Sequence, residues 1–136
     1  MKVVLDTNVL FAALVADGLC RELFRRVIRA KALATCEPLL LELEEILSRK
    51  LHPTPAVTRF LAALRRQVTL VEPVPLAVPV CRDPDDDVVL ATAVAARATA
   101  IVTGDADLLV LREYGNIPIL SPRQLLEFLD QRVSDE

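Results

Sequence analysis

Short apolar runs alternate with amphipathic helical stretches along nearly the whole chain, and this alternation restricts the fold more than any other feature. The runs are rich in β-branched residues, as buried parallel strands are. We expect strands at residues 2–5, 32–36, 68–71, 100–103 and 117–120. We expect helices at residues 8–14, 19–30, 38–49, 54–66, 83–97, 107–112 and 122–131. This order predicts an α/β sandwich with a mostly parallel central sheet.

The composition is that of a folded domain with a sizeable core. The chain has 136 residues, of which 53% are hydrophobic, and this excludes the disordered and collagen-like classes. We expect a single domain over residues 1–136. The proline-rich segment 72–80 interrupts the alternation and is predicted to be an extended loop or an edge segment.

Several signals predict a cytoplasmic protein that does not cross a membrane. The longest nearly apolar runs, 9–16 and 88–96, are shorter than the roughly 20 residues of a membrane helix, and no secretory signal opens the sequence. The three cysteines are odd in number and lack metal-type spacing, which indicates reduced thiols. With His52 as the one histidine, zinc chemistry and a Ser–His–Asp triad are not expected.

Aspartates follow two of the expected strands. Asp6 comes directly after the first strand, and Asp105 comes after the strand at 100–103. Asp87 lies in the opening turn of the helix that starts at Asp83. Because ligands of open parallel sheets bind at the carboxyl ends of the strands, we expect these three carboxylates to converge on one cleft.

Each acid also has a purely structural interpretation. Asp6 is suited to cap the helix that follows it, and Asp105, which follows a glycine, is typical of a turn. The run from Asp83 to Asp87 supplies a cap, a proline and acids that complement the helix dipole, although it holds more acids than a cap needs.

A fourth acid is expected on the helix at 38–49. Its apolar residues form one stripe, and Glu45 falls almost opposite that stripe, so it is a solvated charge. Glu42 and Glu44 lie at the two borders of the stripe. Periodicity therefore leaves two candidates.

Four segments carry these acids together with characteristic neighbours. They are VLDTNVL at 4–10, LELEEIL at 41–47, CRDPDDD at 81–87 and VTGDADLL at 102–109. In this order they resemble the motifs of the PIN-domain ribonucleases, in particular the VapC-like bacterial toxins of toxin–antitoxin modules. The terminal segment ILSP at 119–122, with the helix that follows it, also fits, so the resemblance spans essentially the whole chain.

The resemblance implies a PIN-like α/β/α sandwich and a set of catalytic, metal-binding acids. The acids it implies are Asp6, Glu42, Asp87 and Asp105, with Thr7, Asn8 and Thr103 as supporting polar groups. Asp86 is a rival to its neighbour Asp87, and Asp107 is a rival to Asp105. We favour Asp87 because it lies four residues after Asp83 and leads into the segment LATA at 90–93.

Carboxylates at these positions suit hard divalent cations, and two such ions can promote hydrolysis of a phosphodiester. We therefore expect Mg²⁺- or Mn²⁺-dependent cleavage of RNA. The resemblance also implies a homodimer and a cognate antitoxin. The alternative is a catalytically silent PIN-fold binding module that a partner protein sequesters.

The net charge of −3 argues against a protein that holds nucleic acid by bulk charge. Without the four acids of the implied site, however, 15 acids remain against 16 bases. Arg21, Arg25 and Arg29 recur at every fourth position and predict a basic helix face, either for RNA phosphates or simply for solvent. With four Phe, one Tyr and no Trp, the chain offers little aromatic surface for stacking bases.

Overall fold

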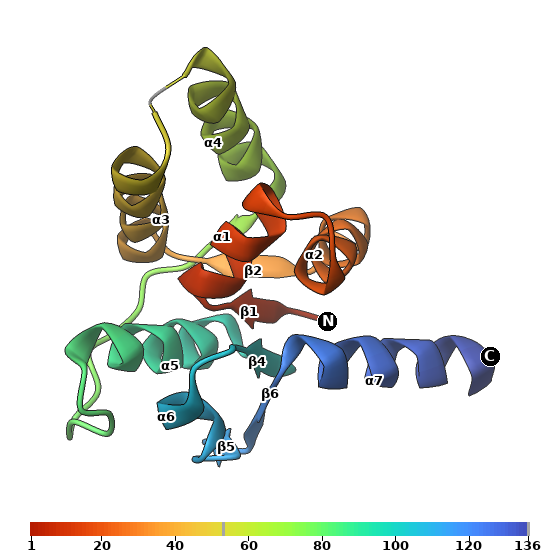
Figure 1. Cartoon of the computed structure of the whole chain (residues 1–136). Helices are drawn as coiled ribbons and strands as arrows, with labels where there is room; N and C mark the ends of the chain where they lie inside the picture. Colours follow the sequence, from red (N-terminus) through yellow and green to blue (C-terminus); the bar gives the residue numbers. More distant parts are fainter. Residues whose placement is uncertain (53, 136) are drawn as a thin grey trace.

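The computed structural model describes residues 1–52 and 54–135, and its centre is a six-stranded sheet (Figure 1). The strands are β1 (Val3–Leu5), β2 (Leu33–Thr35), β3 (Thr69–Leu70), β4 (Ala100–Val102), β5 (Glu113–Tyr114) and β6 (Ile117–Leu120). They lie in the order β3-β2-β1-β4-β6-β5. Every neighbouring pair is parallel except β5 and β6.

Helices connect the strands and cover both faces of the sheet (Figure 1). They are α1 (Thr7–Val15), α2 (Leu19–Arg29), α3 (Glu37–Lys50), α4 (Pro55–Gln67), α5 (Pro84–Ala96), α6 (Ala106–Leu109) and α7 (Pro122–Asp135). The predicted α/β sandwich with a mostly parallel sheet is confirmed. Among the described residues, no helix combines the length and the apolar character that crossing a membrane requires.

The two faces of β1 belong to two hydrophobic cores. All three residues of β1 are buried, because the strand lies in the middle of the sheet. Val3 and Leu5 pack with residues of α1, α2, α3, α4 and α7, whereas Val4 packs with residues of α5 and α6. This division follows from the alternation of side chains along a strand. It produces the three layers of the sandwich.

The hairpin of β5 and β6 is a feature that the sequence analysis missed. Tyr114 pairs with Ile117, and the two residues between them, Gly115 and Asn116, both have positive φ angles of 55° and 67°. Two-residue hairpin loops with both φ angles positive match the twist of the flanking strands, and Gly and Asn favour them. The Gly-Asn pair was therefore a usable signal for this turn.

The parallel strands β1 and β4 end at the same edge of the sheet, and polar residues follow both of them there. Leu5 at the end of β1 pairs with Val102 at the end of β4, and the amide of Asp6 donates to the carbonyl of Val102 at 2.9 Å. The next residue of β4, Thr103, remains tied to the sheet by its amide, which donates to Leu120 at 3.0 Å. The residues that follow β1 and β4 are therefore neighbours.

Candidate active site

Asp6 and Thr103 form the best-defined contact at this edge. The Thr103 hydroxyl donates a hydrogen bond of 2.7 Å to Oδ2 of Asp6 and accepts one of 3.0 Å from the amide of Asp105. Asp6 is 6% exposed and Thr103 is fully buried. Although Asp6 stands at the N-cap position of α1, its carboxylate makes no capping hydrogen bond to the described residues of that helix. The hydroxyl of Thr103, which follows β4, is the side chain that orients this carboxylate.

The pKa of Asp6 reflects this position. Burial raises this pKa. The hydrogen bond from the Thr103 hydroxyl and the interactions with the backbone of Thr7 and Asn8 lower it. The negative charge of Asp105 adds to the increase, and the resulting pKa lies above the ordinary value for Asp. A carboxylate in such a place is stabilised by any cation that approaches it.

Two aspartates follow β4, and they face different neighbours. Asp105 caps α6, because its Oδ1 accepts a hydrogen bond of 2.9 Å from the amide of Asp107, and its charge acts on Asp6. Asp107 is exposed and forms an ion pair of 3.3 Å with Arg82. Of these two rivals, Asp105 is therefore the one that neighbours Asp6.

The carboxylate of Asp87 holds the segment in front of α5. Its Oδ1 accepts a hydrogen bond of 2.8 Å from the amide of Cys81, and its Oδ2 accepts one of 3.2 Å from the amide of Val80. Burial alone would raise the pKa of Asp87, but these bonds and one from the Cys81 thiol lower it below the ordinary value. The same contacts and burial raise the pKa of the Cys81 thiol to about 12.

Asp86, the residue beside it, faces the other acids. Burial and then the charges of Asp105 and Asp6 raise the pKa of Asp86 to about 6. The sequence favoured Asp87 over Asp86 for the third acid. Asp86 is the one on which the charges of Asp105 and Asp6 act, and which of the two binds a metal stays a prediction. Adjacent residues lie about 100° apart around a helix, so Asp86 and Asp87 leave the first turn of α5 in different directions.

The choice between Glu42 and Glu44 also has a structural answer. Glu42 is half-buried, and its pKa is raised by burial and then by the charges of Asp85 and Asp6. Glu44 is exposed on the side of α3 that faces α4, where the pKa of Arg65 is raised by its bond with Glu37 and, more weakly, by Glu44. Glu42 is thus the glutamate that faces the aspartates.

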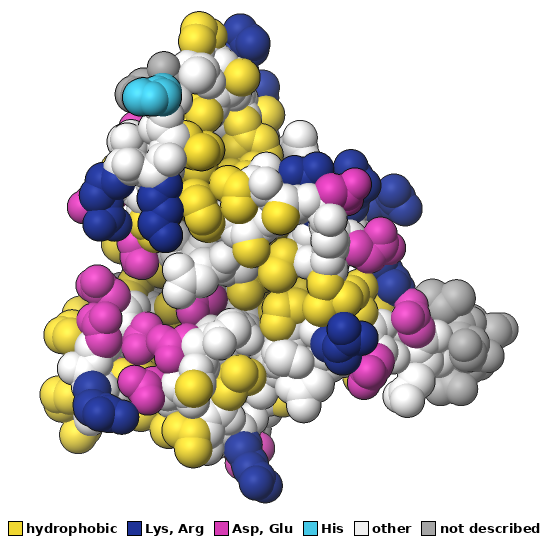
Figure 2. All heavy atoms as spheres, in the orientation of Figure 1, with side chains coloured by type: hydrophobic (Ala, Val, Ile, Leu, Met, Phe, Trp, Pro, Cys, Tyr) yellow, Lys and Arg dark blue, Asp and Glu magenta, His cyan; other side chains and the backbone are white. Residues whose placement is uncertain are grey.

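Four acids therefore share one region, which we call the acidic site. Its members are Asp6, Glu42, Asp86 and Asp105. Figure 2 shows Asp and Glu side chains gathered where α3, α5 and α6 approach one another in Figure 1. Within the described part of the chain, no three His, Cys, Asp or Glu side chains are spaced as ligands of one metal ion. The site offers oxygen donors of the kind that Mg²⁺ and Mn²⁺ prefer.

Two buried hydroxyl groups have no hydrogen-bond partner among the described residues. They belong to Thr7, which follows Asp6, and to Thr35, which ends β2 at the same edge of the sheet. Asn8, the third expected polar group, is exposed. The sequence analysis missed Thr35, although a polar residue at the end of a buried strand is a usable signal.

The basic residues of α2 lie away from the acidic site. Arg21 donates hydrogen bonds of 2.9 Å to the carbonyls of Ala13 and Leu14, so it satisfies the last turn of α1. Arg25 and Arg29 are exposed, and α2 ends at Arg29 just before the chain enters β2. They therefore lie toward the amino edge of the sheet, opposite the acids. The structure does not bring the predicted substrate-binding arginines to the predicted catalytic acids.

Comparison with known proteins gives one result for this chain. A family model described as PIN domain matches residues 2–107. The matched region contains all four residues of the acidic site and every strand as far as β4. A search of curated proteins found no match.

Proposed function

Because this chain belongs to the PIN-domain family, whose members are generally nucleases, we propose that it is a metal-dependent endoribonuclease that hydrolyses RNA phosphodiester bonds. The observation that carries the proposal is the grouping of four acids around Asp6, which is buried and oriented by Thr103.

The acids of the site fit a hard divalent cation in chemistry and charge. Asp6, Asp86 and Asp105 would hold Mg²⁺ or Mn²⁺, with Glu42 completing the set directly or through water. Such a cation, when bound, polarises the phosphodiester and lowers the pKa of an attacking water. Its positive charge also removes the repulsion that raises the pKa values of Asp86 and Glu42.

Thr103 has a positioning role in this proposal. Its hydroxyl fixes one oxygen of Asp6 and, through the amide of Asp105, couples the orientation of two acids. Groups that orient ligands in this way contribute to both metal affinity and rate.

The biological setting is proposed from the motifs. The four segments that resemble VapC-like toxins support a role as the toxin of a toxin–antitoxin module, active in the cytoplasm as a homodimer and inhibited by a cognate antitoxin. With a net charge of −3, the protein would hold RNA through local contacts at the acidic site rather than through bulk charge.

A catalytically silent binding module is the second candidate. The observation in its favour is that no three described acids, histidines or cysteines are spaced as ligands of one ion. The two functions predict different behaviour with metal, since a silent module would neither cleave RNA nor change its stability when Mn²⁺ is added.

RNA cleavage by the purified protein distinguishes the two functions. A mixed RNA pool is incubated with Mg²⁺, Mn²⁺ or EDTA, and wild type is compared with Asp6→Asn. The control is Asp17→Asn, the same change at an exposed residue between α1 and α2. We expect cleavage by wild type and by the control with metal, and none with EDTA or with Asp6→Asn. Equal cleavage by Asp6→Asn would show that another protein or another site is responsible.

A further inference from the structure

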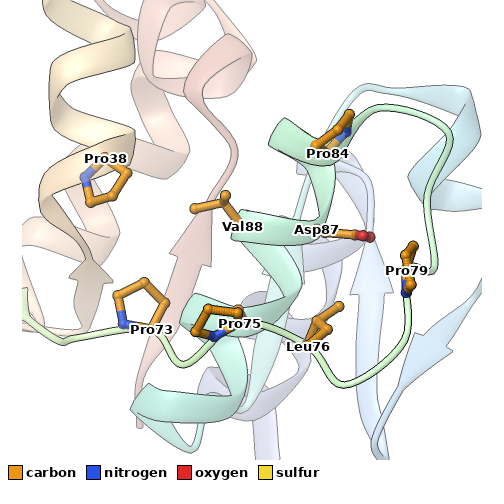
Figure 3. Close-up of a pocket in the computed structure, with 9 residues that line it drawn as sticks. Pro38, Pro73, Pro75, Leu76, Pro79, Pro84, Asp87 and Val88 are labelled. Carbon is orange, nitrogen blue, oxygen red and sulfur yellow. The ribbon is translucent and has the colours of Figure 1, made fainter.

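An apolar cavity of about 370 Å³ lies beside the acidic site, and the proposed chemistry does not use it (Figure 3). Its walls come from the start of α3, from the segment between β3 and α5, and from α5 itself. The residues that define it are Pro38, Pro73, Pro75, Leu76, Pro79 and Val88. Sites for small ligands are typically apolar hollows of about 300–1,000 Å³ with few polar groups, and this cavity is within that range.

The segment between β3 and α5, which forms one wall of the cavity, has several constraints on its backbone. Proline rings at 73, 75 and 79 fix the backbone φ angle near each of those positions. Asp87 accepts hydrogen bonds from the amides of Val80 and Cys81, which ties the end of the segment to α5. Leu76 packs against the hydrophobic core that contains Val4 and residues of α5 and α6. The cavity is therefore formed in advance, and a ligand would lose little free energy to ordering the protein.

The cavity adjoins a second hollow that reaches Glu42 of the acidic site. This second hollow, of about 270 Å³, shares Pro38 and Val88 with the cavity and has Glu42 and Asp85 on its wall. Figure 3 shows Val88 between Pro38 and the proline segment, with Asp87 directed toward Pro79. Val88 and Pro38 therefore separate the cavity from a hollow that Glu42 lines, so the cavity lies next to the acids.

Resting on the proposed nuclease function, we infer that this cavity is a subsite for the nucleobase next to the scissile phosphate. A phosphodiester held at the acidic site carries a sugar and a flat base as its nearest neighbours. Every base has an apolar face that stacks without regard to sequence. In a chain with only four Phe, one Tyr and no Trp, proline rings and aliphatic side chains supply that surface. Since both Asp87 oxygens are already bonded to the backbone, the subsite would select bases by size more than by hydrogen bonding.

Binding of mononucleotides tests this inference without requiring cleavage. Adenosine 5′-monophosphate and uridine 5′-monophosphate are compared with ribose 5-phosphate, in the presence of Mg²⁺, by NMR of the methyl groups of Leu76, Val88 and Ala91, which line the cavity. Ribose 5-phosphate carries the same phosphate and sugar without a base. We expect the two nucleotides to shift these signals and ribose 5-phosphate to leave them in place. Equal shifts from all three ligands, or none from the nucleotides, would overturn the inference.

A matched pair of variants on α5 gives a second readout. Val88→Phe adds bulk at a residue that lines both hollows, whereas Val94→Phe makes the same change at a residue of α5 that is 50% exposed. We expect nucleotide binding to weaken about tenfold in Val88→Phe, which corresponds to about 1.4 kcal/mol, and to be unchanged in Val94→Phe. Equal binding by both variants would contradict a base in the cavity.

The results separate this inference from the proposed function. Nucleotide-dependent shifts in a protein that cleaves no RNA would support the subsite and count against the nuclease. Metal-dependent cleavage without base-dependent shifts would support the nuclease and overturn the subsite. The comparison of ligands on the wild-type protein remains decisive even where Val88→Phe fails to fold.

Discussion

The Thr103 hydroxyl donates a hydrogen bond of 2.7 Å to the Asp6 carboxylate, although the two residues are 97 positions apart in the sequence. The contact exists because β1 and β4 are adjacent parallel strands that end at the same level of the sheet. It gives the most buried acid of the site a fixed orientation.

Replacement of Thr103 tests this positioning role. Thr103→Val keeps the shape of the side chain but removes the donor to Asp6 and the acceptor for the amide of Asp105. We expect Mn²⁺ affinity and cleavage rate to fall about 10–100-fold, as for other groups that orient metal ligands. Because this bond lowers the pKa of Asp6, its loss should also move the pH profile of cleavage toward higher pH.

Thr103→Ser is the matched variant, since it keeps the hydroxyl group. It should restore the affinity and the pH profile of the wild type. A purely structural role for Thr103 would lower the melting temperature in Thr103→Val without moving the pH profile, and that result would contradict the account.

The pKa of Asp86 predicts a pH-dependent loss of stability in the absence of metal. The ordinary pKa of Asp is 3.8, and in the folded protein that of Asp86 is about 6. Between these values the folded state binds more protons than the unfolded state, so the free energy of unfolding decreases as the pH rises. The stabilising contribution of the protonated group is present below about pH 4 and is lost above about pH 6.

Asp86→Asn removes this dependence. We expect the variant to melt at a higher temperature than wild type at pH 7 in EDTA, and the difference to shrink toward pH 4. Thermal unfolding followed by circular dichroism at a series of pH values measures it. A variant that is less stable than wild type by the same amount at every pH would show that Asp86 does not experience the charges of the other acids.

The arginines of α2 are predicted to have separate roles. Arg21→Leu leaves the carbonyls of Ala13 and Leu14 without their donor, and we expect it to destabilise the protein by about 1–3 kcal/mol. Arg25→Leu, at an exposed position on the same helix, should change stability by less than about 0.5 kcal/mol. Urea denaturation compares the two.

The same helix provides a test of where RNA binds. Since Arg25 lies toward the amino edge of the sheet, its reversal to Glu should leave the affinity for RNA at low salt unchanged. A loss of affinity in Arg25→Glu would mean that RNA extends along α2, as the basic face first indicated.

Most of the architecture could be predicted from the sequence because each element carries its own signal. Buried strands are continuous apolar runs, and the helices between them are amphipathic or begin with Pro or Asp. Asp6 and Asp105 were also predictable, since an acid that directly follows a parallel strand must lie at the carboxyl edge. Of the hairpin, β6 was predicted and β5 was missed, because β5 is only two residues long.

Features that depend on how distant elements pack were not predictable in the same way. The border positions of Glu42 and Glu44 are equivalent by periodicity, and the packing of α5 and β1 beside α3 distinguishes them. Asp86 and Asp87 are adjacent in the sequence. Only the structure shows that Asp87 is the one that accepts hydrogen bonds from the amides of Val80 and Cys81. A helical stripe such as that of Arg21 shows which residues share a face, but it does not show which edge of the sheet lies nearby.

The affinity of three proteins for Mn²⁺, measured by titration calorimetry at pH 7, tests the central claim most directly. Wild type is compared with Asp86→Asn and Asp87→Asn, two identical changes at adjacent positions. We predict that Asp86→Asn weakens Mn²⁺ binding by at least about tenfold, because it removes a ligand, and that Asp87→Asn keeps the affinity within about twofold. An Asp87→Asn protein that loses Mn²⁺ binding while Asp86→Asn retains it would contradict the assignment of the acidic site.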